Sequence, residues 1–278
     1  MVRIIADTST LYNSRQAEEA GFNVNPLSVT IAGKSYKEFD EISSEDFVSI
    51  IRQGHMPTSS QPSIGDVTAT FERYPEDEII NLAMADGLSG TYNSAVAAAN
   101  LCDHSANITV INTRTLCGPH RHMVEKANTL VKEGKTKDEI LAALNEIIDT
   151  HKSYLLPADF DYLRRGGRLS PLVSYVGKAA NLTPVMTQTD DGCRLTIAAV
   201  RRGFAHGFKY VAEAMTKQGI GAGWKIYVVH ADAPASAQKA LEIMKNAIPD
   251  AQYEVHPLSP AFITQGGPGC VAIQAIKI

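Results

Sequence analysis

The chain has 278 residues, of which 44% are hydrophobic and 20% charged, and these proportions are ordinary for a globular protein. They exclude collagen-like, coiled-coil and largely disordered chains, and the length allows two medium-sized domains. Lys and Arg total 26 against 30 Asp and Glu, a net charge of -4 that gives no electrostatic reason to bind nucleic acid or anionic lipid.

The first half of the chain alternates predicted strands with predicted helices. In chain order these are a strand at Ile4–Ile5, a hairpin within Val24–Tyr36, a helix from Ser43 to Gly54, a helix through Ile64 and Phe71, a strand at Ile79–Met84, a helix at Tyr92–Asn100, a strand at Ile108–Ile111, a helix from Pro119 to Gly134, and a helix opened by the capping box of Thr136 and Glu139. Strands that alternate with helices predict a parallel sheet covered on both faces.

From Ser153 onward the pattern changes. The expected elements are a strand at Tyr154–Leu156, a short helix at Phe160–Arg165 closed by two glycines, a helix at Ser170–Asn181, two strands around the turn Asp190-Asp191-Gly192, a helix at Gly203–Lys217, a strand at Lys225–Val229, a helix at Ala235–Asn246, and strands at Gln252–Val255 and Cys270–Ile278. A hairpin mixed with helices predicts an α+β domain, with the domain boundary near residue 152.

The cysteines and the apolar segments predict a soluble, cytoplasmic protein. Cys102, Cys117, Cys193 and Cys270 lie far apart and have no C-x-x-C spacing, so we expect reduced thiols and no metal or redox site. The apolar stretch before Asp7 is too short for a signal peptide. No window approaches 18 uninterrupted apolar residues, so we expect no stable membrane insertion.

Two loops of the first half carry several hydroxyl groups. Thr58-Ser59-Ser60 lies between two prolines, and Ser89 and Thr91 lie in the loop that follows the strand at Ile79–Met84. Each loop has an ordinary interpretation: the first is a turn that bonds its own backbone, and the second uses Ser89 or Thr91 as a helix N-cap. Because both loops adjoin one α/β sheet, they could also converge at its carboxyl edge and offer neutral donors to a small anion.

The sequence favours binding over covalent chemistry. Neither G-x-x-x-x-G-K-[ST] nor G-x-G-x-x-G occurs, so we expect no nucleotide site in this chain. The loop around Ser89 resembles a nucleophile elbow, but Thr91 stands where G-x-S-x-G needs glycine, and the histidines follow no triad order. A hydrolase or acyltransferase that uses Ser89 as nucleophile remains the alternative. We interpret His120 and His122 as solvated helix residues rather than metal ligands.

Glycines give two further candidate contacts. Arg164-Arg165-Gly166-Gly167-Arg168 is either a solvated basic face or an anion contact, because the glycines allow the backbone and Arg168 to approach a ligand. The run Gly266-Gly267-Pro268-Gly269 is either a turn or another stretch of backbone pressed against a ligand.

Five segments, taken together and in order, resemble the DegV family across nearly the whole chain. They are Asp7-Thr8-Ser9, Pro57-Thr58-Ser59-Ser60-Gln61-Pro62-Ser63, the run from Gly87-Leu88-Ser89-Gly90-Thr91 to Ala95, the run from Phe160 through Arg164-Arg165-Gly166-Gly167-Arg168 to Ser170, and Gly267-Pro268-Gly269.

The resemblance implies a fold and a function. The fold has an N-terminal three-layer α/β/α domain with a parallel sheet at residues 1–152, and a C-terminal α+β domain with a mixed six-stranded sheet at residues 153–278. The resemblance further implies that a long-chain fatty acid such as palmitate is bound between the domains, with no other cofactor and no metal. Some members carry the acyl chain for a bacterial fatty acid kinase, whose separate ATP-binding subunit makes acyl phosphate; such a chain is a binding subunit and not an enzyme.

The resemblance also implies site residues. Ser59 and Ser89 stand at the positions whose hydroxyl groups donate hydrogen bonds to the carboxylate, and Arg168 matches the Gly-Gly-Arg motif at the polar end or at the domain junction. The other candidates around them are Thr58, Ser60, Gly90 and Thr91.

Two positions depart from the family pattern. Gln265 stands where a histidine is common, and Thr183 stands where a lysine is common. Gln265 is a candidate ligand contact because its amide forms hydrogen bonds, although it cannot carry a proton charge. These departures leave a binder of another amphipathic acid as a further alternative.

Overall fold

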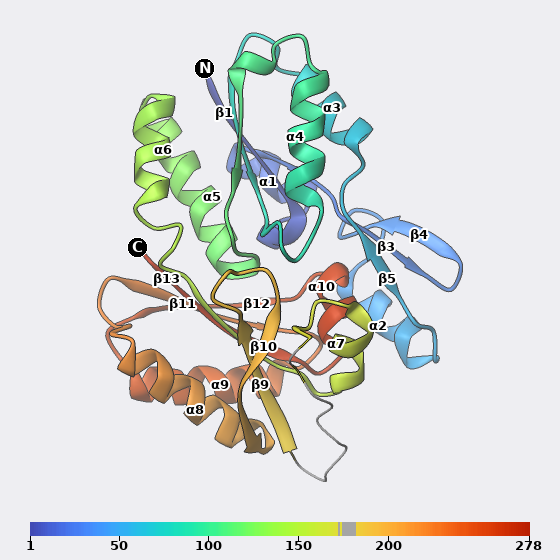
Figure 1. Ribbon diagram of the computed structural model, residues 1–278, viewed down its shortest axis with the longest axis vertical. Coiled ribbons are helices and arrows are strands. Elements are labelled where there is room, and N and C mark those ends of the chain that lie inside the picture. The colour runs from blue at the N-terminus through green and yellow to red at the C-terminus, as the bar shows by residue number, and fades with distance from the viewer. Residues whose placement is uncertain (172, 174–181) are drawn as a thin grey trace.

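The computed structural model describes residues 1–171, 173 and 182–278. Within these residues the strands form three sheets, two large ones and a small one (Figure 1). The helix predicted for Ser170–Asn181 falls almost entirely outside the described residues.

The first large sheet is parallel and has helices on both faces. Its strands, in spatial order, are β2 (Asn23–Asn25), β1 (Val2–Asp7), β6 (Glu78–Ala83) and β7 (Ile108–Asn112). Side chains alternate between the two faces of a strand, so Ile5 packs with α3 and α4 while Ile4 packs on the side of α5. The predicted three-layer α/β/α arrangement is therefore confirmed.

Some helices of this half begin at a residue whose side chain caps the helix, and others have no side-chain cap. They are α1 (Ser14–Ala20), α2 (Ser44–Arg52), α3 (Ile64–Glu72), α4 (Thr91–Leu101), α5 (Cys117–Lys132) and α6 (Lys137–Asn145), with short 3-10 turns η1 (Thr8–Thr10) and η2 (Ser105–Asn107). Ser43 Oγ accepts a hydrogen bond from the Asp46 amide, and Thr136 forms the predicted capping box with Glu139. The start of α5 lies at Cys117, two residues before the predicted Pro119.

The second large sheet is mixed and has six strands among the described residues. In spatial order they are β10 (Leu195–Arg202), β9 (Leu182–Gln188), β8 (Lys152–Leu156), β13 (Val271–Lys277), β11 (Trp224–His230) and β12 (Gln252–Pro257). Helices α8 (Gly203–Lys217) and α9 (Pro234–Ala247) pack on one face. Two short helices, α7 (Phe160–Gly166) and α10 (Pro260–Gly266), pack against each other at one end; α10 was not predicted.

The small sheet contains the first hydroxyl-rich segment. Its order is β4 (Lys34–Lys37), β3 (Ser28–Ile31) and β5 (Thr58–Ser60), with β3 and β4 forming the predicted hairpin. Val24 belongs instead to β2 of the parallel sheet. The prediction of a loop at Thr58–Ser60 is wrong, because these residues pair with β3, which fixes Ser59 opposite Val29.

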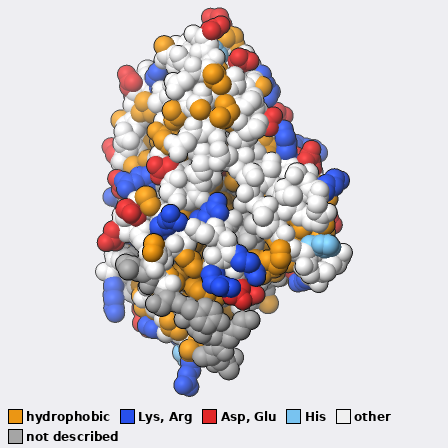
Figure 2. All heavy atoms as spheres, turned by 45° about the vertical axis from the view of Figure 1, so that its right-hand side comes forward, with side chains coloured by type: hydrophobic (Ala, Val, Ile, Leu, Met, Phe, Trp, Pro, Cys, Tyr) orange, Lys and Arg blue, Asp and Glu red, His pale blue; other side chains and the backbone are white. Residues whose placement is uncertain are grey.

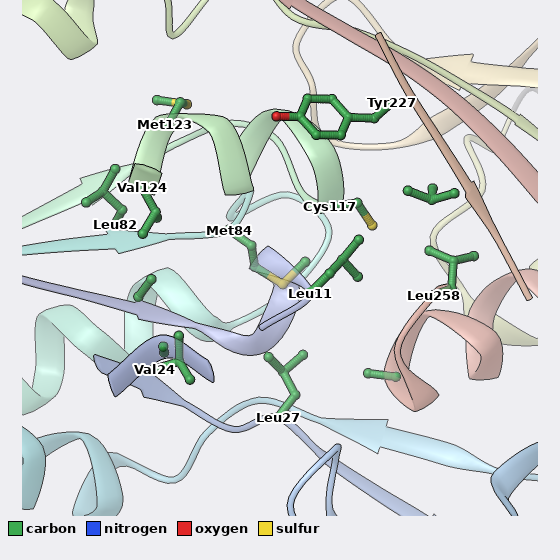
Figure 3. Packing of buried hydrophobic residues seen from close by; sticks show 14 of the residues in the cluster. Leu11, Val24, Leu27, Leu82, Met84, Cys117, Met123, Val124, Tyr227 and Leu258 are labelled. Carbon is green, nitrogen blue, oxygen red and sulfur yellow. The ribbon is translucent and has the colours of Figure 1, made fainter. Parts of the chain in front are cut away.

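Helix α5 joins the two large sheets. It packs on β1 of the parallel sheet and on β11 and β13 of the mixed sheet. One hydrophobic cluster therefore contains residues from both halves of the chain, including Met84, Cys117, Tyr227 and Leu258 (Figure 3).

The surface and the helices agree with the composition. Acidic and basic side chains are interspersed over one face of the molecule, as the small net charge predicts (Figure 2). In the ranges that the structure describes, no helix is both long enough and apolar enough to cross a membrane.

Candidate functional site

A cavity of about 410 Å³ lies between the two large sheets. Its volume falls within the range of small-molecule sites. Most of its lining is apolar and comes from both halves of the chain, including Leu27, Met84, Leu116, Cys117, Leu155, Met186, Leu258, Phe262 and Ala272. Figure 3 shows four of these side chains, those of Leu27, Met84, Cys117 and Leu258, around one space.

Ser59 and Gln265 form one polar corner of this cavity. Gln265 Nε2, on α10, donates a hydrogen bond of 3.1 Å to Ser59 Oγ, on β5. Because Ser59 Oγ receives this bond, the hydroxyl hydrogen of Ser59 is left for another acceptor. Gln265 Oε1 is buried and has no hydrogen-bond partner among the described residues.

Ser89 and Gly90 line the same cavity from the loop between β6 and α4. The Thr91 amide donates to Ser89 Oγ at 3.3 Å, and the hydroxyl oxygens of Ser89 and Thr91 lie 2.8 Å apart. The N-cap of α4 is Gly90, so the prediction of Ser89 or Thr91 as N-cap is wrong. The hydrogen bonds of Ser89 run to Thr91, which is no general base, and this geometry does not support Ser89 as an activated nucleophile.

Two glycines of the site lie directly against glutamine side chains. A Cβ atom at Gly166 would overlap Gln265 Oε1, and a Cβ atom at Gly90 would overlap Gln61 Oε1. Because glycine has no Cβ atom, each carboxamide can lie directly over the backbone at these positions.

Arg168 connects the mixed sheet to the loop that carries Ser89. Its Nε donates to the Leu88 carbonyl at 3.2 Å, and its Nη1 donates to the Gly166 carbonyl. Arg168 is half-buried and lines the cavity. In contrast, Arg164 and Arg165 are exposed, and the guanidinium of Arg165 lies 4.9 Å from the centre of the Tyr162 ring.

Most of the predicted site residues converge on the cavity. Those that line it are Ser59, Ser60, Ser89, Gly90, Arg168 and Gln265. Thr58 and Thr91 are outside the lining: Thr58 is exposed and paired with Thr30, and Thr91 is buried behind Ser89. Thr183, the other departure from the family pattern, is buried in β9 and also outside the lining.

Sequence reasoning missed several polar residues of the lining. Gln61 lies in one of the segments that carry the family resemblance, and the others come from the mixed sheet: Ser153, Thr187, Gln188 and Gln274. Gln274 could have been identified from the sequence, because it interrupts an apolar strand and a buried amide at such a position needs hydrogen-bond partners.

A second polar cluster lies buried at the carboxyl end of β1. The Thr8 hydroxyl donates to Glu38, and the Ala261 amide of α10 donates to Glu38 Oε2 at 2.8 Å. Burial raises the pKa of Glu38 to about 7. The Asp7 carboxylate accepts from the amides of Ser9 and Met84.

His120 completes this cluster as a neutral side chain. Its Nε2 lies 3.1 Å from the Leu82 carbonyl and must donate to it, so Nδ1 accepts from the Ser9 hydroxyl at 2.6 Å. Burial lowers the pKa of His120, and burial also lowers the pKa of His122 to about 4. The interpretation of both as solvated residues is therefore wrong. Across the residues that the structure describes, no three His, Cys, Asp or Glu side chains are grouped to hold a metal ion.

Comparisons with known proteins agree with the fold. A family model described as an uncharacterised protein of the DegV family matches residues 1–277. A DegV domain-containing protein from Staphylococcus aureus strain N315 is 29% identical over 280 residues, which cover 99% of this chain and 98% of that protein.

Two solved structures are similar over the whole chain. The first, described as fatty acid binding of a DegV family protein from Thermus thermophilus, has a TM-score of 0.89 at 25% identity and covers 100% of this chain and 99% of that one. The second, a DegV lipid binding protein from Thermotoga maritima, has a TM-score of 0.87 at 25% identity and covers 100% and 98%.

Proposed function

The chain belongs to the DegV family, and from this we propose that it binds a long-chain fatty acid in the cavity between its two large sheets. Residues 1–152 and 153–278 act in this proposal as two domains that enclose the acyl chain. The observation that carries the proposal is a mainly apolar cavity with the hydroxyl groups of Ser59 and Ser89 on its lining.

The acyl tail supplies most of the binding free energy. About 14 methylenes removed from water gain on the order of 11 kcal/mol, at ~0.8 kcal/mol each, before the cost of immobilising the chain is subtracted. Apolar side chains such as Leu155 and Met186 provide the surface that replaces water.

The carboxylate is held by neutral donors. Ser59 and Ser89 each receive a hydrogen bond from an amide N–H, which leaves the hydroxyl hydrogen of Ser59 for the ligand and supports the same role for Ser89. Such donors are needed because a buried carboxylate without partners would take up a proton. Arg168 already donates from Nε and Nη1 to two carbonyl oxygens, and its charge adds positive potential to the cavity.

This mode of binding suits presentation to a kinase. Neutral donors leave a carboxylate oxygen nucleophilic, whereas a tight bidentate salt bridge would impede its attack on a γ-phosphate. We propose that a separate ATP-binding subunit transfers the phosphoryl group and forms acyl phosphate and ADP. The chain itself then acts in the cytoplasm as a binding subunit, without a nucleotide site, a metal or a catalytic residue of its own.

Mass spectrometry of an organic extract of the purified protein tests the proposal. We expect a long-chain fatty acid in stoichiometric amount, and saturable uptake of palmitate after delipidation. An empty extract together with no uptake of palmitate would contradict it. For the kinase step, acyl phosphate is expected only when an ATP-binding subunit is added; formation by the isolated protein would contradict the assignment as a binding subunit.

A further inference from the structure

The mixed sheet presents two different rows of side chains to the cavity. On the first row, Leu155 of β8 lies between Met186 of β9 and Ala272 of β13. The next row that faces the same way has Ser153 beside Gln274, and the register of β8 and β9 places Gln188 on its other side. All six residues line the cavity, so its floor is apolar along one row and polar along the next.

The polar row lies farther from the corner formed by Ser59 and Gln265 than the apolar row does. Gly266, next to Gln265 in α10, lies against the Leu155 side chain, because a Cβ atom there would be 3.9 Å from Leu155 Cδ1. Strand β13 then runs away from α10, so Gln274 lies beyond Ala272 by two residues, or roughly 7 Å. A chain that enters at Ser59 therefore passes the apolar row before it reaches the polar row.

The side chains of the polar row differ in how many of their hydrogen-bonding groups already have a partner. Gln274 is fully used: Nε2 donates to Leu116 O at 3.1 Å and to Ser153 Oγ at 3.0 Å, and Oε1 accepts from the Gly118 amide at 3.2 Å. Ser153 Oγ receives that bond, so its own hydrogen is left to be donated. Gln188 Nε2 reaches the carbonyls of Arg114 and Gly192 only at 3.4 and 3.5 Å, so its amide is weakly held.

Ser153 and Gln188 are half-buried, and an unsubstituted acyl chain lying over them would cover their polar groups without offering a partner, which is unfavourable. The charges of the cavity lining indicate which kind of polar group a ligand can place at this row. Among the described lining residues the cavity has one Lys or Arg, Arg168, and the hydrogen bonds of its guanidinium go to the carbonyls of Leu88 and Gly166 and not to Ser153 or Gln188. A neutral group therefore suits the distal row better than a second carboxylate.

We propose that the preferred ligand is a hydroxy fatty acid whose hydroxyl group lies in the distal part of the chain, against Ser153 and Gln188. The hydroxyl oxygen accepts the Ser153 hydrogen, and the hydroxyl hydrogen is donated to the Gln188 carboxamide oxygen. This inference rests on the proposed function, because it assumes that the carboxylate is bound at Ser59 and Ser89.

Titration with positional isomers tests the inference. Octadecanoic acid is compared with hydroxyoctadecanoic acids that carry the hydroxyl group at carbon 2 or at single positions beyond carbon 8. We expect at least one distal isomer to bind about fivefold tighter than octadecanoic acid, the ratio that one net hydrogen bond gives. The 2-hydroxy isomer, whose hydroxyl group stays near the carboxylate, should show no such gain.

Substitutions in the polar row test whether its side chains cause the tighter binding of the distal isomer. Ser153→Ala and Gln188→Met should each remove the preference for the distal isomer, and Ser105→Ala, the same change at an exposed remote serine, should keep it. Thermal unfolding of the ligand-free variants checks that they fold. Weaker binding of every distal isomer than of octadecanoic acid, or an unchanged preference in both Ser153→Ala and Gln188→Met, would overturn this inference alone. Absence of binding by all of these acids would overturn the proposed function as well.

Discussion

Two polar clusters adjoin the cavity, and they differ in how completely their hydrogen bonds are used. At the end of β1, the buried groups of Thr8, Glu38, Ser9 and His120 bond to one another or to the backbone. At the cavity corner, Ser59 has a hydroxyl hydrogen to donate, and Gln265 has a carbonyl oxygen with no partner within the described part of the chain.

The comparison shows that residue type does not reveal which polar groups bind ligands. Ser9 and Ser89 are both serines near the end of a parallel strand, and Ser9 even donates to a histidine. Ser9, however, is fully buried and outside the cavity lining, whereas Ser89 lines the cavity. We therefore regard the first cluster, Thr8, Ser9, Glu38 and His120, as part of the folded core and call it the closed cluster. The second, Ser59, Ser89 and Gln265, is the ligand site, and we call it the open cluster. Four variants, one of them a double variant, test these roles.

The largest effect is expected from filling the cavity with Ala272→Trp. If the new side chain excludes about five methylenes of the ligand, binding loses ~4 kcal/mol, or about a thousandfold in affinity for palmitate. Ala235→Trp, the same change on the exposed face of α9, should bind normally in the same fluorescence titration. Equal affinities of the two variants would mean that the ligand lies elsewhere.

Glu38→Gln examines the closed cluster through the pH dependence of stability. The pKa of Glu38 is about 7 in the folded protein against a usual 4.5, so the folded state holds an extra proton between these values. This contribution to the free energy of unfolding is complete below pH 4.5 and falls by about 3 kcal/mol as the pH rises through 7. Denaturant titrations at pH 5 and pH 8 should show a smaller loss in Glu38→Gln than in the wild type. The same loss in both proteins would contradict this role.

The double variant Ser59→Ala with Ser89→Ala removes the donors of the open cluster. We expect roughly 2 kcal/mol weaker binding of palmitate, about thirtyfold, because two hydrogen bonds to a charged group are lost while the tail contacts remain. Thermal unfolding of the ligand-free protein should change little. Thr58→Ala is the matched control, since Thr58 is exposed on the same strand as Ser59 and outside the cavity lining. Wild-type affinity in the double variant would place the carboxylate at another site.

The smallest effect is expected from Gly166→Ala, which acts on the open cluster indirectly. The added methyl group overlaps Gln265 Oε1 and should move the amide away from Ser59. Ser59 then loses the contact that orients its hydroxyl, and affinity should fall about fivefold, the ratio of one hydrogen bond. Gly221→Ala, where an added Cβ has open space, should bind as the wild type does. A Gly166→Ala variant with unchanged affinity would argue against the orienting role of Gln265.

Much of the fold could be predicted because its signals are local. The apolar run at Ile79–Met84 and the capping box at Thr136 each identify an element without reference to the rest of the chain. Strand β5 lacks such a signal, because it is three residues long and polar, and its pairing with β3 makes it a strand. Helix α10 is also short, although Pro260 at its first position was a visible start signal.

The site was only partly predictable because its contacts are distant in sequence. Gln265 and Ser59 are 206 positions apart, and Gln265 became a candidate through a family resemblance and not through its own pattern. The polar row of the cavity floor depends on the register of three strands, which the residues Ser153 and Gln188 do not reveal individually.

A crystal structure of the protein with palmitate would test the assignment of the open cluster most directly. We expect the carboxylate oxygens to lie within hydrogen-bonding distance of Ser59 Oγ and Ser89 Oγ, with the acyl chain along Leu155 and Met186. A carboxylate bound at Ser153 and Gln188, or an acyl chain outside the cavity, would contradict it.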